Sequence, residues 1–302
     1  MQLDAHVSTL NRHLQARFGA RVHKLTLSAG FTCPNRDGTL GRKGCTFCNV
    51  RSFHRESEDS IAEQVRQQKA KMDRAALYLA YFQAYTNTYA EVEVLERLYR
   101  SALQQAQVVG LCVGTRPDCV PDAVLRLLAG LRDEGYEVWL ELGLQSASDA
   151  TLERLRRGHG WAAYADAVAR AQAHGVPVCT HLILGLPGED LAQARQTLDQ
   201  VLQAGVQGLK LHPLMVVRGS AMVAAWRKGE LQAPPLAEYA AWAGELIRHT
   251  PAEVIYHRVA ANAHRDTLLA PDWCSSRWPG IHAVLQDLAR HGGQGAALRA
   301  AG

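Results

Sequence analysis

Short apolar runs alternate with amphipathic helical patterns between residues 24 and 212. The apolar runs have the length of β-strands and occupy residues 24–28, 77–82, 108–113, 138–143, 177–184 and 208–212. Helical patterns lie between them, at residues 60–74, 91–105, 121–134, 161–174 and 191–204. Strands that alternate with helices in this way form βαβ units, which build a parallel sheet. The pattern predicts an α/β fold, a partial (β/α)6 barrel of the TIM type, with a doubly wound sheet as the competing architecture.

The regular alternation ends after residue 212. Pro234 and Pro235 interrupt the chain, a helical pattern follows at residues 236–249, and a short apolar run occupies residues 254–257. We therefore predict three regions. These are an N-terminal helix (1–22), the partial barrel (23–215) and a short C-terminal extension that packs on the barrel (216–302).

The composition excludes several classes of protein. With 302 residues, 47% of them hydrophobic, the chain can bury a large core and is too apolar for disorder. It has no apolar segment long enough for a secretory signal or a membrane span, so we expect a cytoplasmic protein without a membrane partner. The net charge of +4 permits a nucleic-acid partner without indicating one. Because cytoplasmic thiols stay reduced, clustered cysteines indicate a metal or catalytic site.

Three of the seven cysteines lie together in the loop after the first predicted strand. Eleven residues separate Cys33 from Cys45, and Cys48 completes a C-x-x-C pair. Three thiolates are one fewer than a closed zinc site or an ordinary 4Fe–4S cluster uses, which leaves one iron open to a substrate or cofactor. The alternatives are a structural zinc site whose fourth ligand is His54 or another cysteine, and a thioredoxin-like redox pair.

The cysteine loop and the segments that follow resemble the radical S-adenosylmethionine (SAM) superfamily. Within it, they are most similar to the YhcC/YtqA-type family, in the branch related to the catalytic subunit of Elongator. The segments that carry this resemblance run in order from about residue 23 to residue 274: CPNRDGTLGRKGCTFC, YFQAYTNTYA, GTRPDC, ELGLQSASD, HLILGLPGE, KLHPL and RDTLLAPDW.

The resemblance implies two cofactors, a 4Fe–4S cluster and SAM. Cys33, Cys45 and Cys48 would bind three irons of the cluster, and the fourth iron would bind the amino and carboxylate groups of SAM. The other positions that the resemblance implies at the SAM site are Phe47, Thr86, Asn87, Thr115, Arg116, Asp118, Glu141, Gln145, Leu184, Gly185, Pro187 and His212.

Some of these positions receive individual roles from the same resemblance. Phe47 would pack near the adenine, which the glycine-rich loop after the fifth strand would also approach. Thr86 and its neighbour stand where the family usually has Gly-Gly-Glu, so other polar groups would replace that carboxylate. Glu141 and Gln145, expected at the end of the fourth strand, would face the ribose or the methionyl end of SAM.

The resemblance also implies the reaction and its partners. A reduced cluster would cleave SAM to a 5′-deoxyadenosyl radical, which abstracts hydrogen from the substrate. Kinship with Elongator-type enzymes suggests the side chain of a tRNA wobble uridine as that substrate, while the modest charge favours a small metabolite or a protein. Further expected partners are tRNA and an electron donor such as flavodoxin or ferredoxin. A zinc-stabilised binding protein without activity is the alternative from another class.

The remaining cysteines divide into two pairs. Cys112 and Cys179 lie in apolar runs, so we expect buried core residues. Cys119 and Cys274 are better placed for a function.

Four other residues allow two interpretations each. Glu141 lies in an apolar run, where a carboxylate is costly unless it is paired or used. His181 fits both a core histidine and a substrate contact. Arg258 and Arg265 belong to a basic tail that fits a solvated edge or a surface for phosphates.

Overall fold

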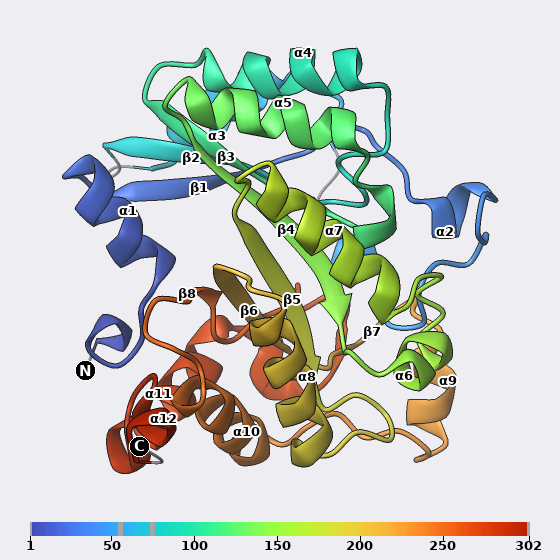
Figure 1. Ribbon diagram of the computed structural model, residues 1–302. Coiled ribbons are helices and arrows are strands. Elements are labelled where there is room, and N and C mark those ends of the chain that lie inside the picture. The colour runs from blue at the N-terminus through green and yellow to red at the C-terminus, as the bar shows by residue number, and fades with distance from the viewer. Residues whose placement is uncertain (1, 54–56, 73–75, 301–302) are drawn as a thin grey trace.

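The computed structural model describes residues 2–53, 57–72 and 76–300. Seven parallel strands form one sheet that curls into a half-barrel (Figure 1), in the order β1-β2-β3-β4-β5-β6-β8. The strands are β1 (Val22–Leu27), β2 (Leu77–Phe82), β3 (Val108–Thr115), β4 (Glu137–Gln145), β5 (Val178–Leu184), β6 (Gly208–Pro213) and β8 (Ile255–Arg258). The predicted partial α/β barrel is therefore confirmed.

Helices connect the strands and cover the outer face of the sheet (Figure 1). They are α3 (Ile61–Lys69), α4 (Val92–Leu103), α5 (Asp122–Asp133), α7 (Trp161–Ala173), α8 (Leu191–Gln203) and α10 (Leu236–Arg248). Each helix buries one face: in α4 the buried residues are Leu95, Tyr99, Ala102 and Leu103, which recur at helical spacing. This burial in a single large core holds the strands in register.

The seventh strand lies beyond the six that the alternation predicts. β8 comes from the short run at 254–257, which the sequence analysis assigns to the C-terminal extension, and it pairs in parallel with β6. Its inward side chain, His257, is polar and bonded to Glu141, so the apolar pattern of a barrel strand is absent there. The boundaries predicted at residues 22/23 and 215/216 stay a prediction.

β1 and β8 are the two edges of the sheet, and the half-barrel is open between them. The N-terminal segment covers this opening at one end. The backbone N–H of Tyr256 donates to the carbonyl of Ser8 at 2.7 Å, and Thr9 forms a parallel bridge with Tyr256. The helix that follows, α1 (Leu10–Phe18), packs against both edge strands.

Alternate residues of β4 define three levels inside the half-barrel. Trp139 joins an apolar cluster with Leu10 of α1 at the N-terminal end of the strands. Glu141 lies at the middle level, fully buried among charged side chains. Gly143 and Gln145 line a cavity at the C-terminal end. Because the N-terminal end is filled with apolar side chains, this cavity opens at the end of the strands where barrel enzymes place their chemistry.

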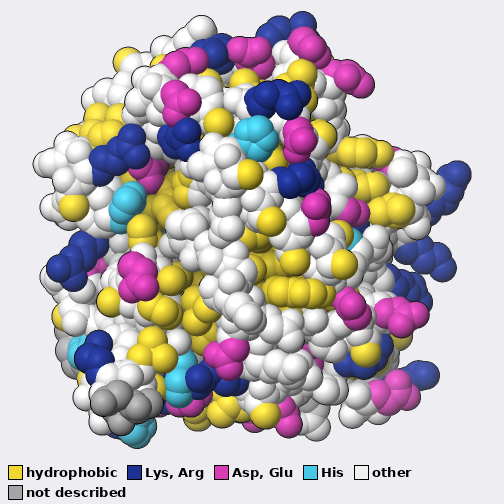
Figure 2. Space-filling model, viewed as in Figure 1, with side chains coloured by type: hydrophobic (Ala, Val, Ile, Leu, Met, Phe, Trp, Pro, Cys, Tyr) yellow, Lys and Arg dark blue, Asp and Glu magenta, His cyan; other side chains and the backbone are white. Residues whose placement is uncertain are grey.

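Shorter elements surround this cavity end. They are α2 (Pro34–Asp37), α6 (Asp149–Arg154), α9 (Met222–Arg227) and the antiparallel pair β7 (Val216–Val217) and β9 (Leu268–Ala270). At the other end of the molecule, α11 (Arg277–His291) packs on α10 and is followed by α12 (Ala296–Ala300). Figure 2 shows Lys and Arg side chains at the edge where Figure 1 places α2 and the loop after it. Within the described ranges, no helix is long and apolar enough to cross a membrane.

Candidate active site

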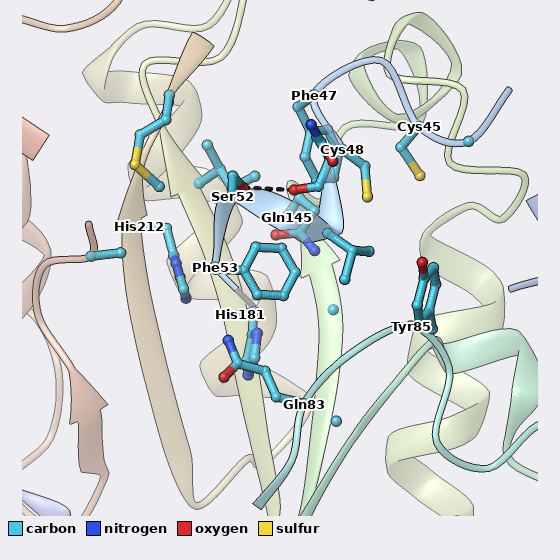
Figure 3. A pocket seen from close by; sticks show the side chains of 18 of the residues that line it. Cys45, Phe47, Cys48, Ser52, Phe53, Gln83, Tyr85, Gln145, His181 and His212 are labelled. Carbon is cyan, nitrogen blue, oxygen red and sulfur yellow. Dashed lines mark hydrogen bonds between the residues drawn. The ribbon is translucent and has the colours of Figure 1, made fainter. Parts of the chain in front are cut away.

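The three motif cysteines line the cavity at the C-terminal ends of the strands. Cys33 follows β1 and precedes α2, while Cys45 and Cys48 lie on one turn in which the Cys48 N–H donates to the Cys45 carbonyl at 3.0 Å. All three belong to the cavity wall. In Figure 3 the Cys45 and Cys48 side chains point toward the space that also holds the ring of Phe53.

Backbone hydrogen bonds anchor the cysteine loop to the barrel. The Gly44 N–H donates to the Asn35 carbonyl at 2.8 Å, and the Thr46 N–H donates to the Leu155 carbonyl at 3.0 Å. Gly44 has a φ of +72°, a left-handed conformation that glycine adopts without strain. The turn at Cys45–Cys48 is therefore held in place before any cofactor binds.

One amide and one guanidinium group contact the Cys45 sulfur. Asn35 Nδ2 and Arg157 Nη1 each lie 3.3 Å from Cys45 Sγ. Burial raises the pKa of this thiol, but the charge and hydrogen bond of Arg157 outweigh burial, so the pKa lies below its ordinary value. Arg36 adds a further contact, since its Nη2 donates to the Cys48 carbonyl at 3.0 Å. The donors to Cys45 favour its thiolate, which is the form that binds iron, whereas burial and the neighbouring Cys45 raise the pKa of Cys48.

The arrangement of the cysteines fits a cluster better than a single ion. The three sulfurs do not all lie within 4.8 Å of one another, which would be expected if they shared one metal ion. In a 4Fe–4S cluster each thiolate binds a different iron, so wider spacing is required. His54, the alternative fourth ligand of a zinc site, lies outside the described residues.

Several residues implied at the SAM site line this cavity with the cysteines. They are Phe47, Thr86, Thr115, Arg116, Glu141, Gln145 and His212. Three of them have a buried polar atom without a hydrogen-bond partner in the described chain: Thr86 Oγ1, Arg116 Nη1 and His212 Nε2. Unpaired buried polar atoms are costly, and a polar ligand in the cavity would satisfy them. The residues present therefore fit both cofactors, and the individual SAM contacts stay predictions.

The other implied positions lie away from the cavity wall as the described residues form it. Asn87 donates from Nδ2 to the Phe82 and Gly114 carbonyls, at 3.1 and 2.8 Å, and so joins the ends of β2 and β3. Asp118 pairs with Arg116 at 2.8 Å and orients that guanidinium.

The loop after β5 also lies outside the wall. Leu184 is buried in the main core, and Pro187 follows it in the same loop. Gly185 has a φ of +83°, and a Cβ there would lie 2.9 Å from Pro234. This close packing and the left-handed backbone explain why the position is occupied by glycine.

Glu141 lies in the middle of β4, where the sequence analysis expects it at the strand end. Its Oε1 lies 2.9 Å from Lys24 Nζ, and Oε2 is paired with Lys210 Nζ. His181 Nε2 and His257 Nδ1 contact the same carboxylate at 2.9 and 3.2 Å. Because a carboxylate only accepts hydrogen bonds, both ring nitrogens carry their protons. Glu141 is thus the counter-ion of the buried Lys210 and the half-buried Lys24.

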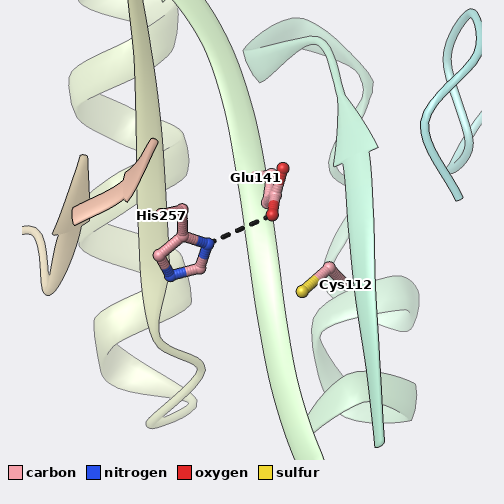
Figure 4. Close-up of side chains that lie close together, drawn as sticks. All are labelled: Cys112, Glu141 and His257. Carbon is pink, nitrogen blue, oxygen red and sulfur yellow. Dashed lines mark hydrogen bonds and ion pairs between the residues drawn. The ribbon is translucent and has the colours of Figure 1, made fainter. Parts of the chain in front are cut away.

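Cys112, Glu141 and His257 approach one another closely enough to suggest a metal site (Figure 4). The two lysines already neutralise the carboxylate, and burial raises the pKa of the Cys112 thiol to about 12. A cation would therefore be repelled, and Cys112 is a core thiol, as the apolar run suggests.

The buried histidines make the stability of the protein depend on pH. Burial and the Lys210 charge lower the pKa of His181 to about 4, and burial and the Lys24 charge lower that of His257 to about 3. In the unfolded chain both rings take up protons near pH 6.5, whereas in the folded chain they stay neutral. The free energy of unfolding should fall as pH drops from about 6.5 toward about 4, by up to about 1.4 kcal/mol per pH unit and histidine. Urea unfolding across that range measures the slope.

Two variants test the assignment of this slope. His257→Gln should reduce it by the share of one histidine. The matched variant His291→Gln, on the exposed end of α11, should leave it unchanged. An unchanged slope in His257→Gln would contradict the assignment.

The two side chains that donate to the Cys45 sulfur were not predicted from the sequence. Asn35 lies two residues after Cys33, so its place in the motif could have pointed to it. Arg157 is more than a hundred residues away and only tertiary contacts bring it in. His181 stacks on His212 with ring centroids 5.5 Å apart, and both line the cavity with Arg258.

Comparison with known families agrees with this geometry. The model for the radical SAM superfamily matches residues 33–201, and the model for the Radical_SAM C-terminal domain matches residues 206–290. The chain belongs to the radical SAM superfamily. It is a radical SAM enzyme, and the cofactors of this superfamily are a 4Fe–4S cluster and SAM.

Individual relatives sharpen the placement. The chain is 57% identical over 300 residues to protein YhcC of Escherichia coli (strain K12), covering 99% of this chain and 97% of YhcC. The predicted YhcC/YtqA-type relationship is thus confirmed. The archaeal Methanocaldococcus infernus Elp3 shares the fold with a TM-score of 0.64 at 16% identity, over 89% of this chain and 63% of that chain. The tRNA uridine(34) acetyltransferase of Dehalococcoides mccartyi is 34% identical over 129 residues, which are 41% of this chain and 27% of that protein.

Proposed function

We propose that the enzyme cleaves SAM reductively and modifies the side chain of a tRNA wobble uridine. A bound cluster and SAM would supply a 5′-deoxyadenosyl radical that removes hydrogen from the substrate. The proposal that SAM is cleaved here rests on the composition of the cavity wall. Three cysteines at one wall share it with the unpaired buried atoms Thr86 Oγ1 and His212 Nε2.

The residues of the cavity divide the work. Cys33, Cys45 and Cys48 would hold the cluster, with Asn35 and Arg157 donating to one sulfur. Thr86, Thr115 and Gln145 would accept and donate hydrogen bonds to the polar groups of SAM. Apolar side chains on the opposite wall, Ile183, Leu214 and Val217, would exclude water from a reactive radical.

Anaerobically prepared protein tests the cleavage. It should be brown, bind about four irons per chain, and release 5′-deoxyadenosine from SAM when dithionite is added. A colourless protein that binds zinc and leaves SAM intact would instead support the non-catalytic alternative.

The tRNA substrate is supported by similarity and by the far wall of the cavity. The acetyltransferase relative acts on tRNA uridine 34, although this chain spans about a quarter of it. Arg258 lines the cavity, and its side chain has no hydrogen-bond or ion-pair partner among the described residues. Phe53 presents an exposed ring to the same space, as a stacking surface for a base would.

Nucleoside analysis separates this substrate from the alternatives. Wobble uridines in tRNA from cells lacking the enzyme should lose a modification that returns when the wild-type chain is restored. An identical nucleoside profile in both strains would contradict the tRNA proposal and favour a small metabolite or a protein.

A single arginine offers a second test of RNA binding. Arg258→Gln should weaken tRNA binding and reduce the slope of log affinity against log salt by about one, as expected for one lost phosphate contact. Arg97→Gln, an equally cationic change on the exposed face of α4, should leave that slope unchanged. Equal slopes in wild type and Arg258→Gln would remove Arg258 from the RNA site.

The proposal also includes an electron donor such as flavodoxin or ferredoxin, and a place in the cytoplasm. All seven cysteines are free thiols, which suits a reducing compartment. The reaction consumes one electron for each SAM cleaved, and a protein carrier of low potential would supply it.

A further inference from the structure

A second hollow lies on the outer side of the cysteine loop, away from the SAM cavity. It is formed where residues 40–44 face the segment that follows α6, and its lining includes Leu40, Arg42, Lys43 and Arg156. Leu40 is 53% exposed, one of few large apolar side chains on the described surface with so much contact with water. An apolar side chain within a polar rim is typical of a protein-binding surface.

The floor of this hollow lies next to a predicted cluster ligand. Asn35 lines the hollow, and its Nδ2 lies 3.3 Å from Cys45 Sγ. Gly44 lines both the hollow and the SAM cavity. One layer of residues therefore separates the outer surface from Cys45, which is a short path for an electron.

The charge around the hollow is positive. Three cationic side chains line it, Arg42, Lys43 and Arg156, and they outnumber the carboxylates of Asp149 and Glu153. The cations form no ion pair with other described residues, and the Asp149 carboxylate is used by the Trp161 N–H at 2.6 Å.

This excess forms part of the basic edge that Figure 2 shows, where Figure 1 places α2. Such a surface attracts an acidic partner and speeds its association at low salt.

We propose that this hollow is the docking surface for a small acidic protein that carries single electrons. The inference rests on the proposed function, because reductive cleavage requires an outside electron. In the docked complex the carrier loses one electron and the cluster held by Cys33, Cys45 and Cys48 gains it, with no bond made or broken. Docking here leaves the opposite cavity free for SAM and substrate.

Charge reversal at the rim tests the surface with flavodoxin as the probe. Arg42→Glu and Lys43→Glu together should lower the affinity of the holoenzyme for oxidised flavodoxin about tenfold at low salt, with a weaker salt dependence than in wild type. Reduction of the cluster by flavodoxin hydroquinone, followed by stopped-flow absorbance, should slow by a similar factor. Reduction by dithionite, which needs no docking, should stay within about twofold of wild type.

Matched variants and a second segment complete the design. Arg97→Glu on α4 and Arg126→Glu on α5 reverse equally exposed charges on other helices, and both measurements should stay at wild-type values. If the double variant binds too little iron, Arg156→Gln neutralises the facing side of the hollow without altering the cysteine loop.

Two results would overturn the proposal. The first is unchanged flavodoxin affinity in the rim variants. The second is an equal loss of cluster reduction by dithionite, which would show that these residues maintain the cluster and do not bind the carrier. Failure of the proposed function is distinct, because SAM would then remain intact with dithionite although flavodoxin still binds.

Discussion

Replacing Cys45 with alanine is expected to remove bound iron and to lower 5′-deoxyadenosine formation by more than about a hundredfold, since even partners of metal ligands cost 10–100-fold. Cys45 receives hydrogen bonds from Asn35 and Arg157, so its loss removes one cluster ligand and one acceptor that both donors share. Iron content, the visible spectrum and SAM cleavage under dithionite measure the effect.

The other cysteines provide matched controls for this result. Cys112→Ala and Cys179→Ala change fully buried core positions, so about 1 kcal/mol of stability should be lost while iron and cleavage are retained. Cys119→Ala and Cys274→Ala test whether these two cysteines have the functional role that their positions suggest. If cleavage survived in Cys45→Ala, or disappeared equally in Cys112→Ala, the ligand assignment would be wrong.

Replacing Glu141 with glutamine is expected to lower the free energy of unfolding by about 3–5 kcal/mol, because it leaves the buried Lys210 and the half-buried Lys24 without a counter-ion. Lys210 is 2% exposed and depends on this carboxylate for its charged form. Burial opposes ionisation of Glu141, but the charges of Lys210 and Lys24 outweigh it and hold the pKa well below its ordinary value. Urea unfolding measures the loss.

A surface pair provides the comparison. Glu134 pairs with Arg100 at 2.7 Å, with both side chains more than a third exposed, so Glu134→Gln should cost less than about 1 kcal/mol. Removing the second charge in Glu141→Gln/Lys210→Met should recover part of the stability that Glu141→Gln loses. Equal losses for Glu141→Gln and Glu134→Gln would show that the buried pair contributes no more than a surface contact.

The strands show how far local pattern reaches. Each of the six predicted runs coincides with a strand of the sheet to within two residues at either end, because helices on the outer face make the outward residues apolar. Residues 254–257 were harder to assign, since β8 is short and turns His257 toward a carboxylate from β4. When the inward residues of a strand bind a charged group on another strand, they are polar, and the strand then lacks the apolar pattern that predicts it.

Glu141 shows the same limit within the site. Its place in an apolar run indicates that the carboxylate must be paired or used. The partners Lys24, Lys210 and His257 come from three other strands, so the choice between a SAM contact and a buried counter-ion depends on how the sheet curls.

The βα alternation, the cysteine motif and the superfamily can be read from the sequence, because each depends on residues close together in the chain or on segments in a fixed order. The folded structure was needed to show which polar groups share the cavity, which donors reach Cys45, and that Leu40 and its cationic neighbours face outward beside the cluster loop. Hydrogen bonds, burial and charge depend on distances across the barrel, and those distances are set only when the strands have paired.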